Sequence, residues 1–223
     1  AKLFKGINQP TVVSILGKTK APVISVSNPV LKVEDIEKHQ FSFDLKSVLA
    51  VSGDKLKFPK CNEIDLIILT KLQQYGKIKN ISYLVNARGE LDLTQYKKYI
   101  SSEDTGTRLI RGDHIRGSVL ASPEESEKDG YVLFNDFINA IKGSTKAKYI
   151  KLSRIVIPQC SYLHKKERIE AAIVPHNCVL GNSCNFIAIE SEKEEREKLF
   201  YYWLVINSSV AEWQFRIFSY NNH

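Results

Sequence analysis

The apolar positions of this chain follow two spacings, one typical of helices and one typical of strands. Four apolar residues recur three or four positions apart: Ile64, Ile67, Ile68 and Leu72. This spacing predicts a helix over residues 63–75. Asn62 stands at the N-cap position of that helix, and Gly76 stands where a glycine in the left-handed conformation would end it.

Two more helices are expected in the C-terminal part of the chain. A charged stretch over residues 192–198 opens the first, and its apolar residues occupy one side: Leu199, Phe200, Trp203, Leu204 and Ile206. The second would follow the capping residues 207–209 and run through Tyr220. We interpret the aromatic residues of both helices as core or partner-facing residues.

Short runs that alternate in polarity or are rich in β-branched residues predict strands elsewhere. They cover residues 11–16, 22–27, 81–87, 108–115, 131–134, 154–158, 171–175 and 185–190. Arg88 and Gly89 predict a turn, Thr94 would cap a short helix through Ile100, and residues 122–129 predict an exposed loop. The predicted fold class is therefore α/β (mixed α+β), rich in β-strands, with C-terminal helices.

The composition is that of a folded protein. The chain has 223 residues, of which 43% are hydrophobic and 10% aromatic, so it can bury the core of one large or two small domains. No apolar stretch is long enough to span a bilayer, and no signal-type apolar core follows the N-terminal lysines, so we expect a cytoplasmic protein without a membrane partner. Methionine is absent even at position 1, which suggests a piece of a longer polypeptide.

The positive charge is concentrated in one window. Residues 142–170 hold eight Lys and Arg residues against two acids, an excess of six charges in a chain whose net charge is +7. Such an excess fits a surface for a polyanion, with nucleic acid first, or a solvated lysine-rich loop. The basic residues of the window are Lys142, Lys146, Lys148, Lys151, Arg154, Lys165, Lys166 and Arg168.

The common catalytic motifs are missing from the chain. We find no dinucleotide or methyl-donor glycine loop, no phosphate loop, no Gly-x-Ser-x-Gly and no His-Glu-x-x-His. His176, Cys178 and Cys184 lie close together, but without a Cys-x-x-Cys pair, so free cysteines are favoured over a zinc site. No catalytic, cofactor-binding or metal-ligating residue is predicted in this chain.

Several segments carry more specific information than charge. In chain order they are residues 86–94 (NARGELDLT), 108–117 (RLIRGDHIRG), 179–186 (VLGNSCNF), 202–209 (YWLVINSS) and 221–223 (NNH). Taken together, they resemble the TaqI-like specificity region of type II restriction-modification methyltransferases, most closely the fused enzymes that methylate adenine and cut outside an asymmetric site. The similarity runs through most of the chain.

This resemblance implies a division of labour within a longer protein. Residues 51–223 would form the target recognition (DNA specificity) domain, and residues 1–50 would be the tail of an upstream methyltransferase domain or a lead-in segment. The partners implied are double-stranded DNA and that upstream domain of the same polypeptide. S-adenosylmethionine is the cofactor implied for the parent protein, an adenine methyltransferase whose endonuclease activity is left open, and no cofactor is implied for this chain.

The candidate DNA-binding residues are basic and amide side chains of these segments and of the basic window. They are Arg88, Arg108, Arg111, His114, Arg116, Lys146, Lys148, Lys165, Lys166, Arg168, Asn182 and Asn185. Arg108, Arg111 and Arg116 would read guanine edges, clamp phosphates, or pair with Asp104 and Asp113.

The loop and amide candidates also have defined expected roles. Lys165, Lys166 and Arg168 are expected to anchor phosphates on an exposed loop. Asn182 and Asn185 would read adenine, or Asn182 would simply form a turn with Gly181. Two other functions stay open: an RNA-binding module, and an interaction domain that docks on a methyltransferase or nuclease through its aromatic C-terminal helices.

Overall fold

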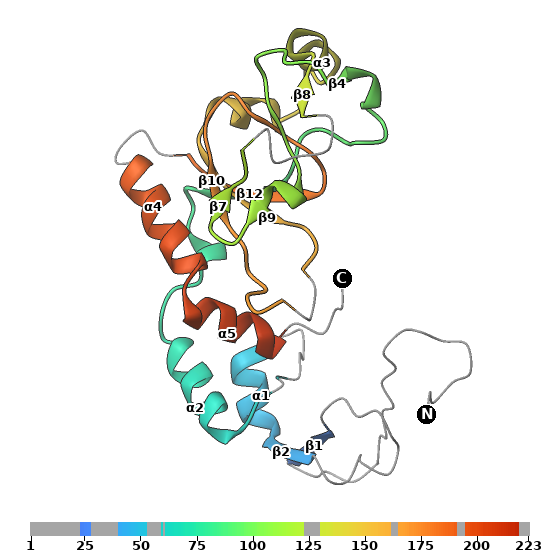
Figure 1. The fold of residues 1–223 in the computed structure, drawn as a ribbon. Coiled ribbons are helices and arrows are strands. Elements are labelled where there is room, and N and C mark those ends of the chain that lie inside the picture. The colour runs from blue at the N-terminus through green and yellow to red at the C-terminus, as the bar shows by residue number, and fades with distance from the viewer. Residues whose placement is uncertain are drawn as a thin grey trace, which may run out of the picture. The chain divides into compact units, whose positions relative to one another are not determined.

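The computed structural model describes residues 23–27, 40–52, 59, 61–122, 130–161, 165–190 and 195–218. It divides into two compact units, Ala1–Gly76 and Lys77–His223 (Figure 1). The expected boundary at residue 50 falls inside helix α1 (Leu45–Ser52). The assignment of residues 1–50 to an upstream domain stays a prediction, and the strand expected over residues 11–16 lies outside the described residues.

The first unit holds a strand pair followed by two helices. Strands β1 (Val23–Ser27) and β2 (Gln40–Asp44) are antiparallel, and β2 leads directly into α1. Helix α2 (Glu63–Leu72) begins as predicted, because the Asn62 side chain accepts a hydrogen bond from the Asp65 N–H at 2.9 Å.

The expected end of α2 is wrong. The helix stops at Leu72, and Gly76 does not adopt the left-handed conformation. The residues after Leu72 instead turn through short-range bonds, such as the one from the Tyr75 N–H to the Leu72 carbonyl at 3.1 Å. This tightened last turn satisfies helix carbonyls without a glycine cap.

A four-stranded antiparallel sheet organises the second unit. Its strand order is β10-β9-β12-β3, with β3 (Leu84–Arg88), β9 (Arg154–Pro158), β10 (Ala172–Val174) and β12 (Cys184–Ile189). The strands predicted near these positions are confirmed. Arg88, however, ends strand β3 opposite Asn185 instead of forming a turn, because β12 offers it a pairing partner.

The two faces of this sheet carry different cores. Val156, Phe186 and Ala188 point to one face and join a buried cluster there. Ile155, Ile187 and Ile189 point to the other face, where they pack against Leu199, Tyr202 and Ile206 of helix α4 (Glu195–Ile206). Strand alternation thus places α4 along one side of the sheet, as Figure 1 shows.

A further buried cluster forms around helix α3 (Phe134–Ala140), which the sequence analysis did not predict.

The short elements are η4 (Ile78–Asn80), η5 (Lys97–Tyr99), β4 (Ile100–Ser101), β5 (Leu109–Ile110), η6 (Gly112–His114), β6 (Ile115–Arg116), β7 (Val119–Leu120), β8 (Tyr131–Val132), η8 (Ala147–Lys151) and β11 (Val179–Leu180).

The helix expected from Thr94 is wrong. Asp92, and not Thr94, accepts the local hydrogen bonds, from the N–H groups of Thr94 and Gln95, and only the 3₁₀ turn η5 follows. A short acceptor side chain that bonds two residues ahead closes a turn and competes with helix formation.

Both expected C-terminal helices are present within the described residues. Helix α5 (Ser209–Phe218) begins after Ser208, whose hydroxyl accepts a hydrogen bond from the Ala211 N–H at 3.2 Å. The fold is therefore mixed α/β, as predicted. No helix among the described residues is long and apolar enough to cross a membrane.

Candidate nucleic-acid interface

Three segments that are distant in the sequence meet at one end of the sheet. We call this place the loop junction and define it as residues 88–89, 111–112 and 182–185. The Gly112 N–H donates to the Ser183 hydroxyl at 3.0 Å, and the Arg88 Nε donates to the Asn182 carbonyl at 2.6 Å. The structure thus brings together residues from three of the five segments that carry the resemblance.

Glycines permit this close approach. A Cβ on Gly89 would collide with the carbonyl oxygen of Gly181, and a Cβ on Gly112 would lie 2.9 Å from the Ser183 carbonyl oxygen. Both neighbours are backbone atoms, which cannot move aside as a flexible side chain would. The backbone geometry of the loop junction therefore depends on these two positions.

The Asn182 side chain is used inside the protein. Its amide nitrogen donates to the Asp92 carboxylate at 2.7 Å, and its backbone carbonyl holds Arg88. Hydrogen bonds from the Gln95 and Thr94 N–H groups, with a smaller part from Asn182, lower the pKa of Asp92. The Asn182 side chain is therefore engaged within the protein, while Asn185 on β12 makes no hydrogen bond with its side chain to any described residue.

Residues 108–117, which hold three of the candidate arginines, are partly buried. His114 is 3% exposed, and its Nδ1 accepts a hydrogen bond from the Arg111 N–H at 3.3 Å. The His114 ring is therefore engaged by the turn η6, and the expectation that it contacts DNA stays a prediction. Arg108 donates from Nη2 to the Ala121 carbonyl, and Arg111 is half-buried, whereas Arg116 is exposed on the hairpin β6–β7.

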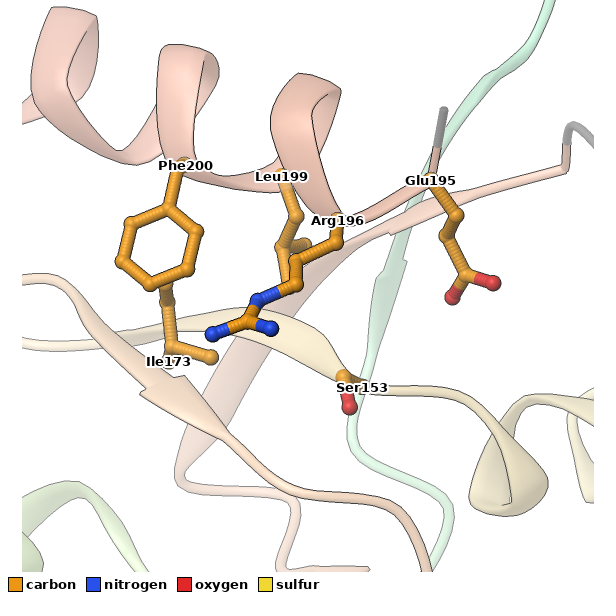
Figure 2. A pocket seen from close by; sticks show the side chains of 6 residues that line it. All are labelled: Ser153, Ile173, Glu195, Arg196, Leu199 and Phe200. Atoms are coloured by element: carbon orange, nitrogen blue, oxygen red, sulfur yellow. The ribbon is translucent and has the colours of Figure 1, made fainter. Parts of the chain in front are cut away.

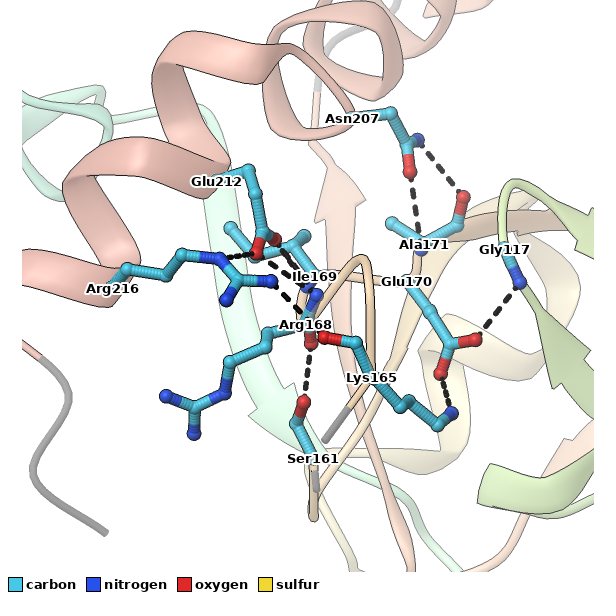
Figure 3. A network of polar contacts seen from close by, with 10 residues as sticks. All are labelled: Gly117, Ser161, Lys165, Arg168, Ile169, Glu170, Ala171, Asn207, Glu212 and Arg216. Carbon is cyan, nitrogen blue, oxygen red and sulfur yellow. Dashed lines mark hydrogen bonds and ion pairs between the residues drawn. The ribbon is translucent and has the colours of Figure 1, made fainter. Parts of the chain in front are cut away.

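The loop 165–170 is tied to helix α5 and to the hairpin (Figure 3). The Glu212 carboxylate accepts hydrogen bonds from the N–H groups of Arg168, at 2.9 Å, and Ile169, at 2.7 Å. Burial raises the pKa of Glu212, but these donors and Arg216 outweigh it, so the pKa lies below the usual value.

The basic residues of this loop have different environments. Lys165 forms an ion pair with Glu170, whose other oxygen accepts a hydrogen bond from the Gly117 N–H at 3.1 Å (Figure 3). Lys166 is exposed, as predicted. Arg168 is only 5% exposed and lies over the Phe215 ring at 5.1 Å, so its expected position on an exposed surface is wrong.

One positive charge of the basic window, that of Arg154, is buried in the protein. Its side chain is fully buried and donates from Nη1 to both carboxylate oxygens of Glu90, at 2.9 and 3.2 Å. Nη2 donates to the Cys178 carbonyl at 2.6 Å, and the guanidinium lies over the Phe186 ring. Burial raises the pKa of Glu90, and the guanidinium opposes that rise.

The segment 142–151 keeps its basic character in the structure. Lys142, Lys148 and Lys151 are exposed, Lys146 is half-buried, and no acid interrupts the segment. Lys148 pairs with Glu190 at 2.5 Å, and this hydrogen bond raises the pKa of the lysine. Glu190 follows β12 five residues beyond Asn185, roughly 17 Å along an extended chain, so Lys148 lies away from the loop junction.

A pocket of about 360 Å³ lies between the start of α4 and the sheet, lined by Ser153, Ile173, Glu195, Arg196, Leu199 and Phe200. Figure 2 shows Arg196 and Phe200 reaching from the helix toward Ile173. None of the candidate DNA-binding residues lines this pocket. It therefore adds no group to the loop junction.

The cysteines offer no metal centre in the described part of the chain. All four are free thiols: Cys61, Cys178 and Cys184 are buried, and Cys160 is exposed. Among the residues described, no group of three or more His, Cys, Asp or Glu side chains is placed to hold a metal ion. Burial raises the pKa of Cys184 to about 12, so this thiol stays protonated.

Sequence reasoning missed Asn86 as a possible functional residue. Asn86 is exposed on β3 and shares a face with Arg88, because side chains two residues apart on a strand point the same way. Extending the predicted strand by one residue, to Arg88, would have revealed this pair.

No protein family model matches the chain, and no curated protein is significantly similar to it.

Proposed function

We propose that the unit Lys77–His223 recognises a specific sequence in double-stranded DNA, as the target recognition domain of a restriction-modification methyltransferase. The loop junction carries this proposal. It joins Arg88, Arg111 and Asn185, the residue types that hydrogen-bond guanine and adenine edges, on a backbone fixed by two glycine contacts. Rigid presentation of such groups supports sequence selection over general charge attraction.

The exposed lysines would supply affinity that is independent of sequence. Lys142 and Lys151 are exposed, lie in a segment without acids, and can contact phosphates. The exposed Arg116 and Lys166 are further candidates for phosphate contacts. Specific DNA-binding proteins combine many phosphate contacts with few base contacts, which matches this division between lysines and the loop junction.

The proposal assigns catalysis to an upstream domain of the same polypeptide. That domain would use S-adenosylmethionine to methylate an adenine in the cytoplasm, where chromosomal DNA is reached. The chain alone should transfer no methyl group to DNA, because the methyl-donor motif is absent from its sequence. Incubation with radiolabelled S-adenosylmethionine and mixed-sequence DNA should therefore give background counts, and reproducible adenine methylation would contradict the proposal.

A salt titration tests the DNA-binding surface. Binding of a labelled duplex should weaken steeply with salt, and replacing Lys142 and Lys151 with Ala should lower the slope of log K against log salt by about 1.8. Replacing Lys77 and Lys79, two exposed lysines outside the basic window, is the matched control and should leave the slope nearly unchanged. Equal effects of both pairs would indicate general charge attraction, and tighter binding to RNA hairpins would favour an RNA-binding module.

A second candidate function rests on helix α4. Tyr201 and Leu204 are each 61% exposed on this helix, and Phe200 is 44% exposed. Exposed apolar groups gathered on one element are typical of a protein-docking surface. Sedimentation would show whether the chain joins a methyltransferase subunit without DNA, and a stable DNA-free complex together with no duplex binding would favour this alternative.

A further inference from the structure

Three polar side chains share one face of the sheet at its β3 edge. Asn86 and Arg88 lie two residues apart on β3, and Asn185 on β12 is the Cα partner of Arg88. Asn86 and Arg88 are exposed, and Asn185 is half-buried. We call these residues the polar triad. The same face of the sheet carries Ile187 and Ile189, which pack beneath α4. The triad residues lie on this face but do not belong to the cluster that α4 covers.

Arg88 is an exposed residue that is anchored through its Nε. Its Nε donates to the Asn182 carbonyl at 2.6 Å, and within the described residues its Nη1 and Nη2 make no hydrogen bond. Asp92 lies near enough to offset part of the positive charge. A guanidinium fixed through Nε presents two parallel N–H donors, which match the O6 and N7 acceptors of guanine.

The two amides offer complementary groups. The side chains of Asn86 and Asn185 form no hydrogen bond with any residue that the structure describes, so each has a donor and an acceptor available. One amide can bond both N6 and N7 of adenine. The triad contains no aromatic ring on which an unpaired base would stack, so its chemistry suits base edges in a duplex groove better than single-stranded RNA.

We propose that the polar triad is the base-reading element of this unit, with Arg88 contacting a guanine and Asn86 and Asn185 contacting adenines in the major groove. This inference rests on the proposed function. β3 is the edge strand of the four-stranded sheet, and strands of β-sheet DNA-binding proteins enter the DNA grooves. Asn86 and Arg88 are about 6.7 Å apart along the strand, close to two base-pair steps of about 3.4 Å, so they should address bases within about two base pairs.

The experiment uses the 223-residue chain and a duplex library. Selection from random duplexes first gives the preferred site, and Kd values are then measured on all single-base variants of that site. Arg88→Ala should raise Kd on the preferred site by about 5- to 150-fold and remove discrimination at one base pair. Asn185→Ala and Asn86→Ala should each relax a different base pair within about two positions of it.

Two further variants distinguish base recognition from an effect of positive charge and from a loss of folding. Arg88→Lys keeps the charge but loses the two parallel donors, so it should keep the salt slope and still lose discrimination at the same base pair. Arg196→Ala, an exposed arginine on α4 in the same unit, is the matched control and should leave the library profile unchanged. Circular dichroism of each variant verifies that the fold is retained.

The outcomes distinguish this inference from the function on which it rests. If the wild-type chain selects a site and the three triad variants keep its full selectivity, the triad does not read bases, while sequence-specific binding stands. If the wild-type chain shows no preference across the library, the proposed function and this inference both fail. Loss of discrimination in Arg88→Lys with an unchanged salt slope supports the assignment.

Discussion

Replacing Arg154 should destabilise the protein strongly without weakening the proposed binding to DNA. The Arg154 and Glu90 side chains are both fully buried, so Arg154→Met would leave a buried carboxylate without its partner. Such a loss costs about 3–5 kcal/mol of unfolding free energy. The unsatisfied Cys178 carbonyl adds about 1 kcal/mol. For a domain with about 5–15 kcal/mol of stability, this is a large fraction.

Urea denaturation measures the effect. With a slope of about 2 kcal/mol per molar urea, the midpoint for Arg154→Met should fall by about 2–3 M. Lys151→Met, an exposed cation of the same basic window, is the matched control and should change stability by less than about 0.5 kcal/mol. The double variant Glu90→Leu with Arg154→Met removes both charges and should recover most of the loss.

A pH series adds an independent signature. With the guanidinium removed, burial keeps the folded-state pKa of Glu90 above its unfolded value, so Arg154→Met should gain stability as the pH falls toward that raised pKa. A loss below about 1 kcal/mol in Arg154→Met, or a double variant as unstable as the single one, would refute the reasoning. The salt slope of duplex binding, measured at low denaturant, should match that of the wild type.

Three further predictions follow from other parts of the structure. Gly89→Ala should lower the unfolding free energy by more than about 1 kcal/mol because its Cβ has no room, whereas Gly76→Ala meets no atom and should be nearly neutral, as urea midpoints will report. The lowered pKa of Glu212 supplies stability that is present above its unfolded pKa and is lost as the pH falls through the folded pKa, so Glu212→Gln should flatten the acid limb of the stability curve. In the native protein, Cys160 should react with a thiol reagent far faster than Cys184, and equal rates would contradict the burial of Cys184.

Elements fixed by neighbouring residues were predictable from the sequence. The start of α2 depends on Asn62 and Asp65, three residues apart, and β9 coincides with its predicted run because that run is β-branched and buried. The prediction of a helix after Thr94 was wrong for an equally local reason. The Asp92 side chain accepts hydrogen bonds from the backbone N–H groups of Thr94 and Gln95, and the sequence analysis overlooked it.

The environment of individual charges could not be predicted in this way. The sequence analysis counted Arg154 as a surface charge, because its partner Glu90 lies 64 residues away and the sequence does not reveal their pairing. Arg168 counted likewise, although Phe215 of α5 covers it. Arg88 was placed in a turn because only the pairing with Asn185, across the sheet, makes it the last residue of a strand. Charge composition therefore led only to the proposed class of partner, while the burial and contacts of each basic side chain emerged only from the tertiary structure.

Because Glu212 anchors residues 168 and 169, this segment can reach its native contacts only after α5 has been synthesised. The bonded groups lie 44 and 43 residues apart, so translation passes residue 168 well before its anchor is made. At translation rates of about 5–20 residues per second, the segment waits a few seconds on the ribosome before α5 is synthesised. A chain shortened before α5 would keep the sheet strands but leave the backbone of this segment without its carboxylate acceptor, so truncation there should expose the segment to proteases before it affects the sheet.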